Sequence, residues 1–219
     1  MIKLVRGQQP TILQRNASAW ATAYRQAIDA GEQRSQIPQR FRHKQIKDAL
    51  RLASSDKCIY CESKISGTQF GDIEHIIPVS LRPDLVVDWN NLGFVCQRCN
   101  NSKRDYWHPT LAVIDPYTEE PVDFLMFLGP IVIHLPSNMR GQITVRKLDL
   151  NRIELVTQRA ERLNQISPLI DRIGALPAGP ERKACMQFLA EEHQPSSEYS
   201  AMVAAFVDAM SERLDASRL

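Results

Sequence analysis

The feature that most constrains the fold is a pair of cysteine motifs, Cys58-x-x-Cys61 and Cys96-x-x-Cys99, separated by the 34 residues 62–95. Each motif can close a tight turn that presents two thiolates, and two such turns supply the four ligands of a tetrahedral zinc ion. Because four thiolates leave no open coordination position, we expect this zinc to be structural and not catalytic. A redox role would not explain two pairs. The sequence therefore predicts a zinc ion that joins the two ends of this segment.

Composition is that of a folded soluble protein. The chain has 219 residues, 43% of them hydrophobic and 24% charged, with a net charge of +2, which excludes a disordered or fibrous chain. No run of about 18 apolar residues predicts a membrane span, and no signal peptide is apparent. Since four of the five cysteines are paired at metal-ligand spacing and Cys185 stands alone, we expect a reducing cytoplasm and no disulfide framework.

A locally basic stretch precedes the first cysteine pair. Residues 34–51 carry six basic side chains against a single acid, Asp48. Such a cluster ahead of a catalytic motif would suit contacts with a phosphate backbone, although a solvated helix face would have the same composition. The basic residues are Arg34, Arg40, Arg42, Lys44, Lys47 and Arg51.

Apolar spacing predicts helices on both sides of the cysteine-containing segment. A strand is expected at Ile143–Leu148, and one or two short strands, including Ile131–Ile133, among the prolines of residues 109–141. Asn151 followed by Glu154 has the form of a capping box at the start of a long helix. The predicted helices are residues 11–30, 42–54, 151–173, 182–192 and 198–214.

Between the cysteine pairs lies the segment Glu74-His75-Ile76-Ile77-Pro78. Hydrolysis of a phosphodiester needs a base and a divalent cation, and an imidazole beside a carboxylate offers groups for both tasks. A histidine taken alone is more often a surface or core residue, but here the second cysteine pair runs directly into a polar segment, Asn100–Arg104. Zinc would fix that segment against the strand that carries His75. Asp72 would share a strand face with Glu74 and is a reserve ligand.

Taken together with Asn91-Leu92 and with Cys96-x-x-Cys99-Asn100-Asn101-Ser102-Lys103, this motif resembles the HNH endonucleases and their ββα-metal fold. The resemblance implies an α+β, mostly helical chain with a zinc-stabilised HNH core and flanking N- and C-terminal helices. The implied divisions are an N-terminal helical region at residues 1–56, a nuclease core at 57–108 and a C-terminal extension at 109–219. Cys58, Cys61, Cys96 and Cys99 would be the zinc ligands.

The resemblance also implies roles for individual residues. His75 would be the general base, and Glu74 and Asn100 the ligands of a catalytic Mg²⁺ or Mn²⁺ ion. Asn91, or Asn90 if the register differs by one, would steady the loop and orient the base. Glu74 stands where Asp or His is more usual and Asn100 where the family name has His, and both are hard oxygen ligands that favour Mg²⁺ or Mn²⁺. Lys103 and Arg104 would contact a nucleic-acid phosphate, or would face solvent.

The chain as a whole resembles a narrower group, the PtuB-like HNH subunits of bacterial Septu antiphage systems, which also occur as effectors beside retrons. This resemblance implies control by an ABC or SMC-like (PtuA-like) ATPase, and in retron systems a reverse transcriptase with its msDNA as further partners. It rests on Met1–Arg6, Lys57–Glu62, Asp88–Leu92, Asp115–Pro116 and Leu148–Arg152.

Two other functions fit parts of the pattern. A zinc-stabilised nucleic-acid-binding module would need the cysteines and the basic residues but not Glu74 and His75, and a docking module for the ATPase would need only the surface that zinc shapes. The side-by-side carboxylate and imidazole favour the nuclease. The sequence leaves open whether its substrate is DNA or RNA, because a one-metal phosphodiesterase site has no inherent need of a deoxyribose.

Overall fold

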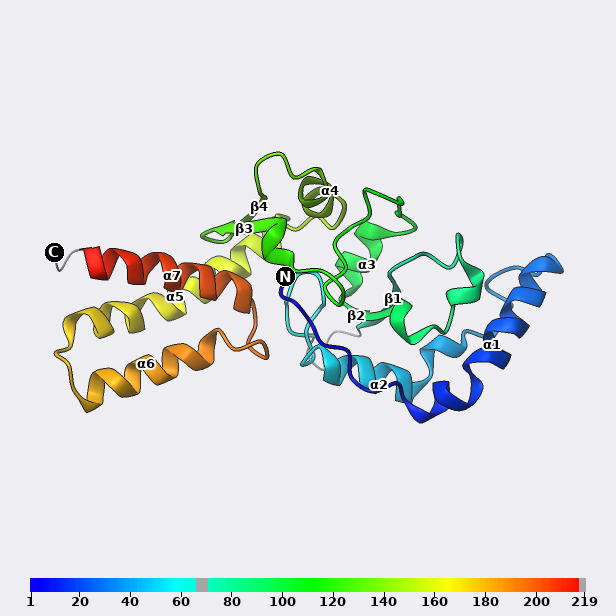
Figure 1. The fold of residues 1–219 in the computed structure, drawn as a ribbon, viewed down its shortest axis with the longest axis horizontal. Coiled ribbons are helices and arrows are strands. Elements are labelled where there is room, and N and C mark those ends of the chain that lie inside the picture. Colours follow the sequence, from blue (N-terminus) through cyan, green and yellow to red (C-terminus); the bar gives the residue numbers. More distant parts are fainter. Residues whose placement is uncertain (66–70, 217–219) are drawn as a thin grey trace.

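The structure of the protein is a computed structural model. It describes residues 1–65 and 71–216, with side chains as far as Ser211. Figure 1 shows an elongated molecule with helix α1 at one end and the helices α5, α6 and α7 at the other. The strands and α3 lie between the two ends. The helices are α1 Thr11–Asp29, α2 Lys44–Ala53, α3 Gln97–Lys103, α4 Met139–Lys147, α5 Ile153–Ala175, α6 Pro180–Glu192 and α7 Ser200–Ala216; the strands are β1 Asp72–His75, β2 Leu92–Val95, β3 Leu125–Leu128 and β4 Ile131–His134.

The centre of the molecule is a ββα unit made of β1, β2 and α3. The two strands are antiparallel, with Asp72 opposite Val95 and His75 opposite Leu92. Helix α2 packs on β2 and α3 contacts β1. All four residues of β2 are buried. The expected α+β class is confirmed.

The N-terminal region covers one side of this unit with two helices. Helix α2 buries Ile46 and Leu50 completely, four residues apart on one face, and begins where His43 Nδ1 accepts from the backbone N–H of Gln45. Helix α1 buries Leu13 and Tyr24 and packs on the short 3₁₀ turn Pro83–Leu85. Both helices lie where the apolar spacing predicted them.

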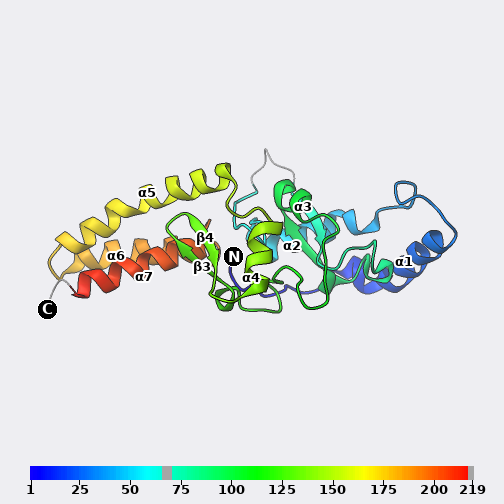
Figure 2. The ribbon, with the colours of Figure 1, turned by 90° about the horizontal axis from the view of Figure 1, so that it is seen from above.

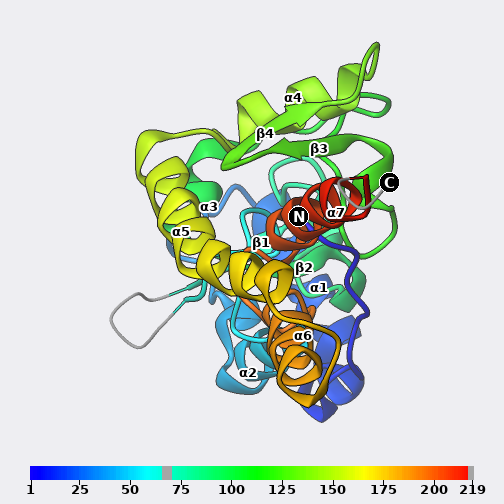
Figure 3. The ribbon, with the colours of Figure 1, turned by 90° about the vertical axis from the view of Figure 1, so that its left-hand side faces the viewer.

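The C-terminal helices form an arm that projects from the core (Figure 2). Helix α5 contacts both α6 and α7, and α7 packs on β3 of the β3–β4 hairpin (Figure 3). The start of α7 also bonds to the segment of the first cysteine pair, where Ser200 Oγ donates to Glu62 at 2.8 Å. The three helices confirm the predicted ones to within a few residues, and β4 confirms the strand expected at Ile131–Ile133. Within the described residues, none of the helices combines the length and the apolar character that crossing a bilayer requires.

Two local predictions were wrong. The predicted strand at Ile143–Leu148 lies mostly in α4, because Asn138 caps a helix there by accepting from Gly141 N at 2.8 Å. The proposed cap Asn151 does not cap α5, whose N-cap is Arg152. Its side chain instead pairs with both backbone groups of Val132, at 3.0 and 2.7 Å, and so extends the edge of the β3–β4 hairpin.

One buried apolar cluster runs through all three parts of the chain, from the N-terminal residues to Val203 in α7. The segment between Cys58 and Cys99 contributes Ile59, Phe94 and Val95 to this cluster. The division at residues 56 and 108 therefore stays a prediction.

Candidate active site and zinc centre

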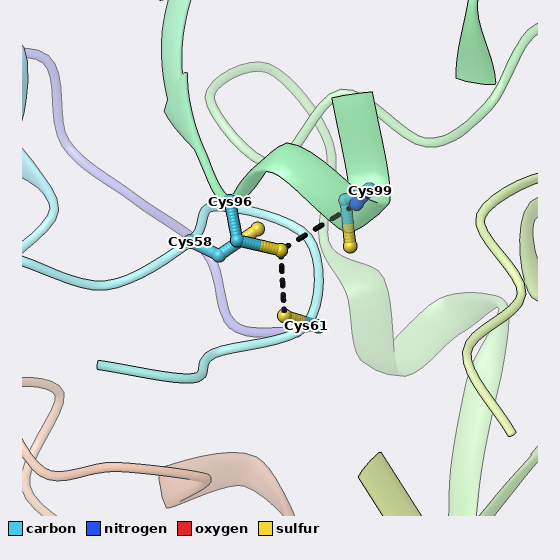
Figure 4. Close-up of side chains that lie close together, drawn as sticks. All are labelled: Cys58, Cys61, Cys96 and Cys99. Atoms are coloured by element: carbon cyan, nitrogen blue, oxygen red, sulfur yellow. Dashed lines mark hydrogen bonds between the residues drawn. The ribbon is translucent and has the colours of Figure 1, made fainter. Parts of the chain in front are cut away.

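The four cysteines of the two motifs converge on one point (Figure 4). Their Sγ atoms all lie within 4.8 Å of one another, and those of Cys61 and Cys96 are 3.8 Å apart. Zinc–sulfur bonds of about 2.3 Å in a tetrahedron place the sulfurs about 3.8 Å apart, so the cluster fits a zinc ion. Cys96 is also the N-cap of α3, and its Sγ accepts from Cys99 N. Zinc would thereby join the turn at Cys58–Cys61 to the start of α3.

The surroundings of the four thiols call for a cation. Burial raises the pKa of the Cys58 thiol, because a thiolate loses its hydration inside the protein. A divalent ion would offset this cost and leave a net charge of about −2 on the four-thiolate centre. The guanidinium of Arg152 lies beside it, with Nη1 3.9 Å from Cys99 Sγ. The donor set and its neighbours thus suit a structural zinc.

His75 ends β1 and is held by two contacts. Its Nε2 lies 2.9 Å from Val86 O, and its ring meets Phe41 edge-on at a centroid distance of 4.6 Å. Burial lowers the pKa of His75 to about 4, the nearby charge of Arg34 acting in the same direction. The ring is therefore neutral at pH 7. Since a carbonyl oxygen can only accept, Nε2 carries the proton and Nδ1 is left free to accept one.

Asn91 ties together the loop that follows His75. Its Oδ1 accepts from Ile77 N at 2.7 Å, and its Nδ2 donates to Ile77 O at 3.0 Å. Its backbone oxygen accepts from Ile76 N at 2.9 Å. The neighbouring Asn90 is exposed and lines a separate depression beside α1, so of the two asparagines it is Asn91 that holds the loop.

Glu74 is buried against Lys103 of α3. Lys103 Nζ lies 2.5 Å from Glu74 Oε1 and forms an ion pair with it, although the angles do not meet those of a hydrogen bond. The same ammonium donates a hydrogen bond to His75 O at 3.0 Å. Burial raises the pKa of Glu74 to about 7 even though this ammonium acts against it. A further cation beside Glu74 would therefore stabilise the ionised form of its carboxyl group.

The structure corrects the expectation for Lys103, which is only 1% exposed and faces neither solvent nor a bound phosphate. Lys103 lies three residues after Asn100, on the same face of α3. The face that brings Asn100 to the strand therefore also buries Lys103 against Glu74.

Asn100 is oriented by Asp72. Its Nδ2 donates to Asp72 Oδ2 at 3.1 Å, and because a carboxylate only accepts, the amide oxygen must point away from Asp72. That oxygen is then free to bind a metal ion. Asp72, expected as a reserve ligand, accepts this hydrogen bond from the ligand candidate Asn100.

These groups meet in a cleft of about 420 Å³ between the N-terminal region and the ββα unit. Glu74, His75, Asn100 and Arg104 all line it, whereas Asn91 and Lys103 lie behind its wall. Sequence reasoning missed Phe41 and Asp105, and it did not assign Arg34 and Arg42 to this cleft. The basic stretch was the signal for the two arginines, but nothing in the sequence placed that stretch opposite His75. The full lining is Arg34, Phe41, Arg42, Ile73, Glu74, His75, Pro78, Val79, Asn100, Asn101, Arg104 and Asp105.

Comparison with known families gives this geometry a context. Residues 58–105 match the family model described as HNH endonuclease. For this similarity, residues 58–105 are called the HNH domain below. The matched residues run from Cys58 to Asp105, and so contain both the thiolate cluster and the β1 and α3 parts of the cleft. Phe41, Arg34 and Arg42 lie outside the matched HNH domain.

Two curated relatives resemble the chain beyond the HNH domain. It is 28% identical over 176 residues to a Septu protein PtuB of Bacillus thuringiensis, a match that covers 73% of this chain and 67% of that protein. It is 26% identical over 152 residues to a Septu protein PtuB of Bacillus mycoides (strain KBAB4), a match that covers 55% of this chain and 52% of that protein. The matches thus span between half and two thirds of these relatives.

Proposed function

We propose that the chain is a metal-dependent endonuclease that hydrolyses phosphodiester bonds of nucleic acid, with His75 as the general base. The observation that carries this proposal is the cleft, where a neutral imidazole with an accepting Nδ1 stands beside the carboxylate of Glu74 and the amide oxygen of Asn100. A binding or docking module would need no such arrangement of base and hard oxygen ligands.

The protein's own groups supply the proton transfer. His75 Nδ1 takes a proton from a water molecule while the water oxygen forms a bond to phosphorus and the bond from phosphorus to the departing oxygen breaks. The contact of Nε2 with Val86 O keeps the ring in the tautomer that can accept this proton. Lys103 holds the carbonyl oxygen of His75 and Asn91 holds the backbone of Ile77 just after it, so the base is oriented before substrate binds.

Glu74 and Asn100 would hold the catalytic ion. Both offer oxygen, the ligand type that suits Mg²⁺ and Mn²⁺, and when bound the ion supplies positive charge to the phosphate and the departing 3′ oxygen. Asp72 keeps the Asn100 oxygen available, and Lys103 keeps Glu74 in place.

The similarity to two Septu PtuB proteins supports a finer proposal for the setting of this activity. We infer a nuclease subunit of a Septu-type antiphage system in bacterial cytoplasm, controlled by a PtuA-like ATPase and, where a retron is present, by its reverse transcriptase and msDNA. The three-helix arm lies outside the HNH domain and offers surface for such a partner.

Cleavage assays on matched variants test the proposal. Wild type, His75→Ala and His108→Ala are incubated with DNA and RNA in Mg²⁺ or Mn²⁺, with and without the ATPase. We expect His75→Ala to lower the rate by about 10²- to 10⁴-fold while keeping one zinc ion per chain and a cooperative melting transition. His108 is exposed and lies outside the cleft, so His108→Ala should cleave normally.

The opposite outcomes separate the alternatives. Equal cleavage by wild type and His75→Ala would remove His75 from the chemistry. Nucleic-acid binding without cleavage under any condition would favour the non-catalytic binding module. Partner binding with neither nucleic-acid binding nor cleavage would favour the docking module.

A further inference from the structure

Three arginines line the same cleft as the candidate catalytic residues: Arg34, Arg42 and Arg104, here named the cleft arginines. All three side chains are exposed. Arg104 follows α3 in the HNH domain, but Arg34 and Arg42 come from the N-terminal region, outside the residues that match the HNH family. The cleft is thus completed by a part of the chain that is not part of the nuclease motif.

Within the described residues, the cleft arginines have no acidic partner, a feature that they share with the exposed Arg15 and Arg40 but not with several other surface arginines. Arg51 pairs with Asp56 at 2.7 Å and Arg82 with Asp84 at 2.6 Å. Across residues 1–65 and 71–211, by contrast, none of the recorded ion pairs includes a cleft arginine. Their charges are therefore available to a ligand.

Uncharged contacts hold the cleft arginines in place. Arg34 Nε donates to the hydroxyl of Tyr24 in α1 at 3.3 Å. The guanidinium of Arg42 lies 5.7 Å from the ring centroid of Phe41, the residue that contacts His75. Arg104 Nε donates to Asn101 O at 3.3 Å. These contacts orient the side chains without neutralising them.

The backbone at Arg104 is strained. Its φ is 50° and its ψ is −135° at the C-cap of α3, a conformation that is unfavourable for a residue with a Cβ atom. A glycine would be the easier residue there, so the arginine side chain is present at an energetic cost. Arg104 lines the cleft together with Asn100, so this residue places a positive charge beside a candidate metal ligand.

The charge balance of the cleft favours an anion. Glu74 already faces the ammonium of Lys103, and the other acid in the lining is Asp105. Three guanidinium groups therefore face one uncompensated carboxylate, and a guanidinium binds phosphate oxygens through paired N–H donors.

We propose that the cleft arginines bind the backbone phosphates of the substrate strand on either side of the reactive phosphodiester, with Arg34 and Arg42 on one wall and Arg104 on the other. This proposal rests on the proposed nuclease function for the identity of the ligand. It makes the N-terminal region part of the substrate-binding site and gives the basic stretch a defined role.

Binding measurements on a non-cleaving parent test it. Fluorescein-labelled 20-base-pair DNA duplex and an RNA hairpin are titrated with His75→Ala protein at 50 to 300 mM NaCl. The same parent carrying Arg34→Ala and Arg42→Ala, or Arg104→Ala, is compared with a control carrying Arg15→Ala and Arg25→Ala on the exposed side of α1. Zinc content and melting temperature confirm that every variant is folded.

We expect the Arg34/Arg42 double variant to bind at least about tenfold more weakly, and the slope of log K against log [salt] to fall by about 2, since each lost phosphate contact removes about 0.9. Arg104→Ala should lower the slope by about 1, and the Arg15/Arg25 control should match the parent. The proposal would be overturned if both cleft variants bound with the same affinity and the same salt slope as the His75→Ala parent. It would also be overturned if the parent bound neither the DNA duplex nor the RNA hairpin.

Cleavage by the wild-type protein separates this test from that of the nuclease function. If wild type cleaves but the cleft variants bind like the parent, the arginine proposal fails and the nuclease stands. If wild type does not cleave but binding depends on the cleft arginines, the nuclease fails and the phosphate site stands.

Discussion

The thiolate cluster and the cleft are only a few residues apart in the HNH domain, yet they are built in opposite ways. The cluster joins four identical donors, buried and within 4.8 Å of one another. The cleft has an imidazole, a carboxylate and an amide, each held by a different neighbour: Val86, Lys103 and Asp72. Helix α3 connects the two, with Cys99 facing the cluster and Asn100 facing the cleft. The comparison supports the proposal that the cluster builds the scaffold on which the catalytic groups are assembled.

Breaking the thiolate cluster should have the largest effect. Cys58→Ser removes a zinc ligand, and since structural zinc contributes on the order of 10 kcal/mol to the folding of small zinc units, we expect loss of zinc and unfolding of the HNH domain. Zinc content and thermal melting measure this. Cys185→Ser, in α6 and outside the cluster, is the control and should keep one zinc per chain. A Cys58→Ser protein with the wild-type melting temperature would refute the scaffold role.

Removing the support of Glu74 should have the next largest effect. Lys103→Met leaves the buried carboxylate without its ammonium, and breaking a buried ion pair costs about 3–5 kcal/mol. Urea unfolding of Lys103→Met, Glu74→Gln and the double variant measures the coupling. We expect the double variant to recover part of the loss, because no unpaired charge then remains. Additive losses would show that the two side chains do not support each other.

A smaller effect should follow from pH through His75. Its folded pKa of about 4 lies below the unfolded value of about 6.5, so the unfolded state binds more protons between these values and stability falls with falling pH. From pH 7 to pH 5 this amounts to about 2 kcal/mol. His75→Ala should lose correspondingly less stability over this range than wild type. Equal losses in the two proteins would mean that His75 is not buried as a neutral ring.

The smallest of these effects is expected at Asp72. Asp72→Ala frees the amide of Asn100 to rotate, and loss of a residue that orients a metal ligand typically costs about tenfold in metal affinity or activity. Cleavage measured against Mg²⁺ concentration should therefore shift to about tenfold higher concentration, with a melting temperature close to wild type. Asp84→Ala, which removes an exposed ion pair with Arg82, is the matched control. An unchanged Mg²⁺ dependence for Asp72→Ala would show that Asp72 does not position Asn100 for metal binding.

Local spacing predicted much of the site. The two Cys-x-x-Cys motifs predicted the cluster, because ligands at this spacing need only a tight turn to converge. Glu74, His75, Asn100 and Arg104, which the sequence singled out, all line one cleft. The roles of these residues in catalysis stay predictions.

What the sequence did not predict depends on contacts between distant segments. Nothing near Phe41 or Arg34 in the sequence indicates that they lie beside His75, since that arrangement arises only when α2 packs on β2. The burial of Lys103 was predictable in principle from its spacing to Asn100, but a lysine in a polar segment is usually solvated. The helix α4 was mistaken for a strand because Ile143, Thr144 and Val145 are β-branched, and the cap at Asn138 overrides that preference.

The most direct test of two metal sites with different tasks is the dependence of cleavage on Mg²⁺ at constant zinc content. Purified protein with one zinc per chain is freed of other divalent ions, and cleavage and zinc content are followed as Mg²⁺ or Mn²⁺ is added. We predict no cleavage before the addition, cleavage after it, and one zinc per chain throughout. Full cleavage by the zinc-only protein, or cleavage that requires loss of the cysteine-bound zinc, would contradict the account.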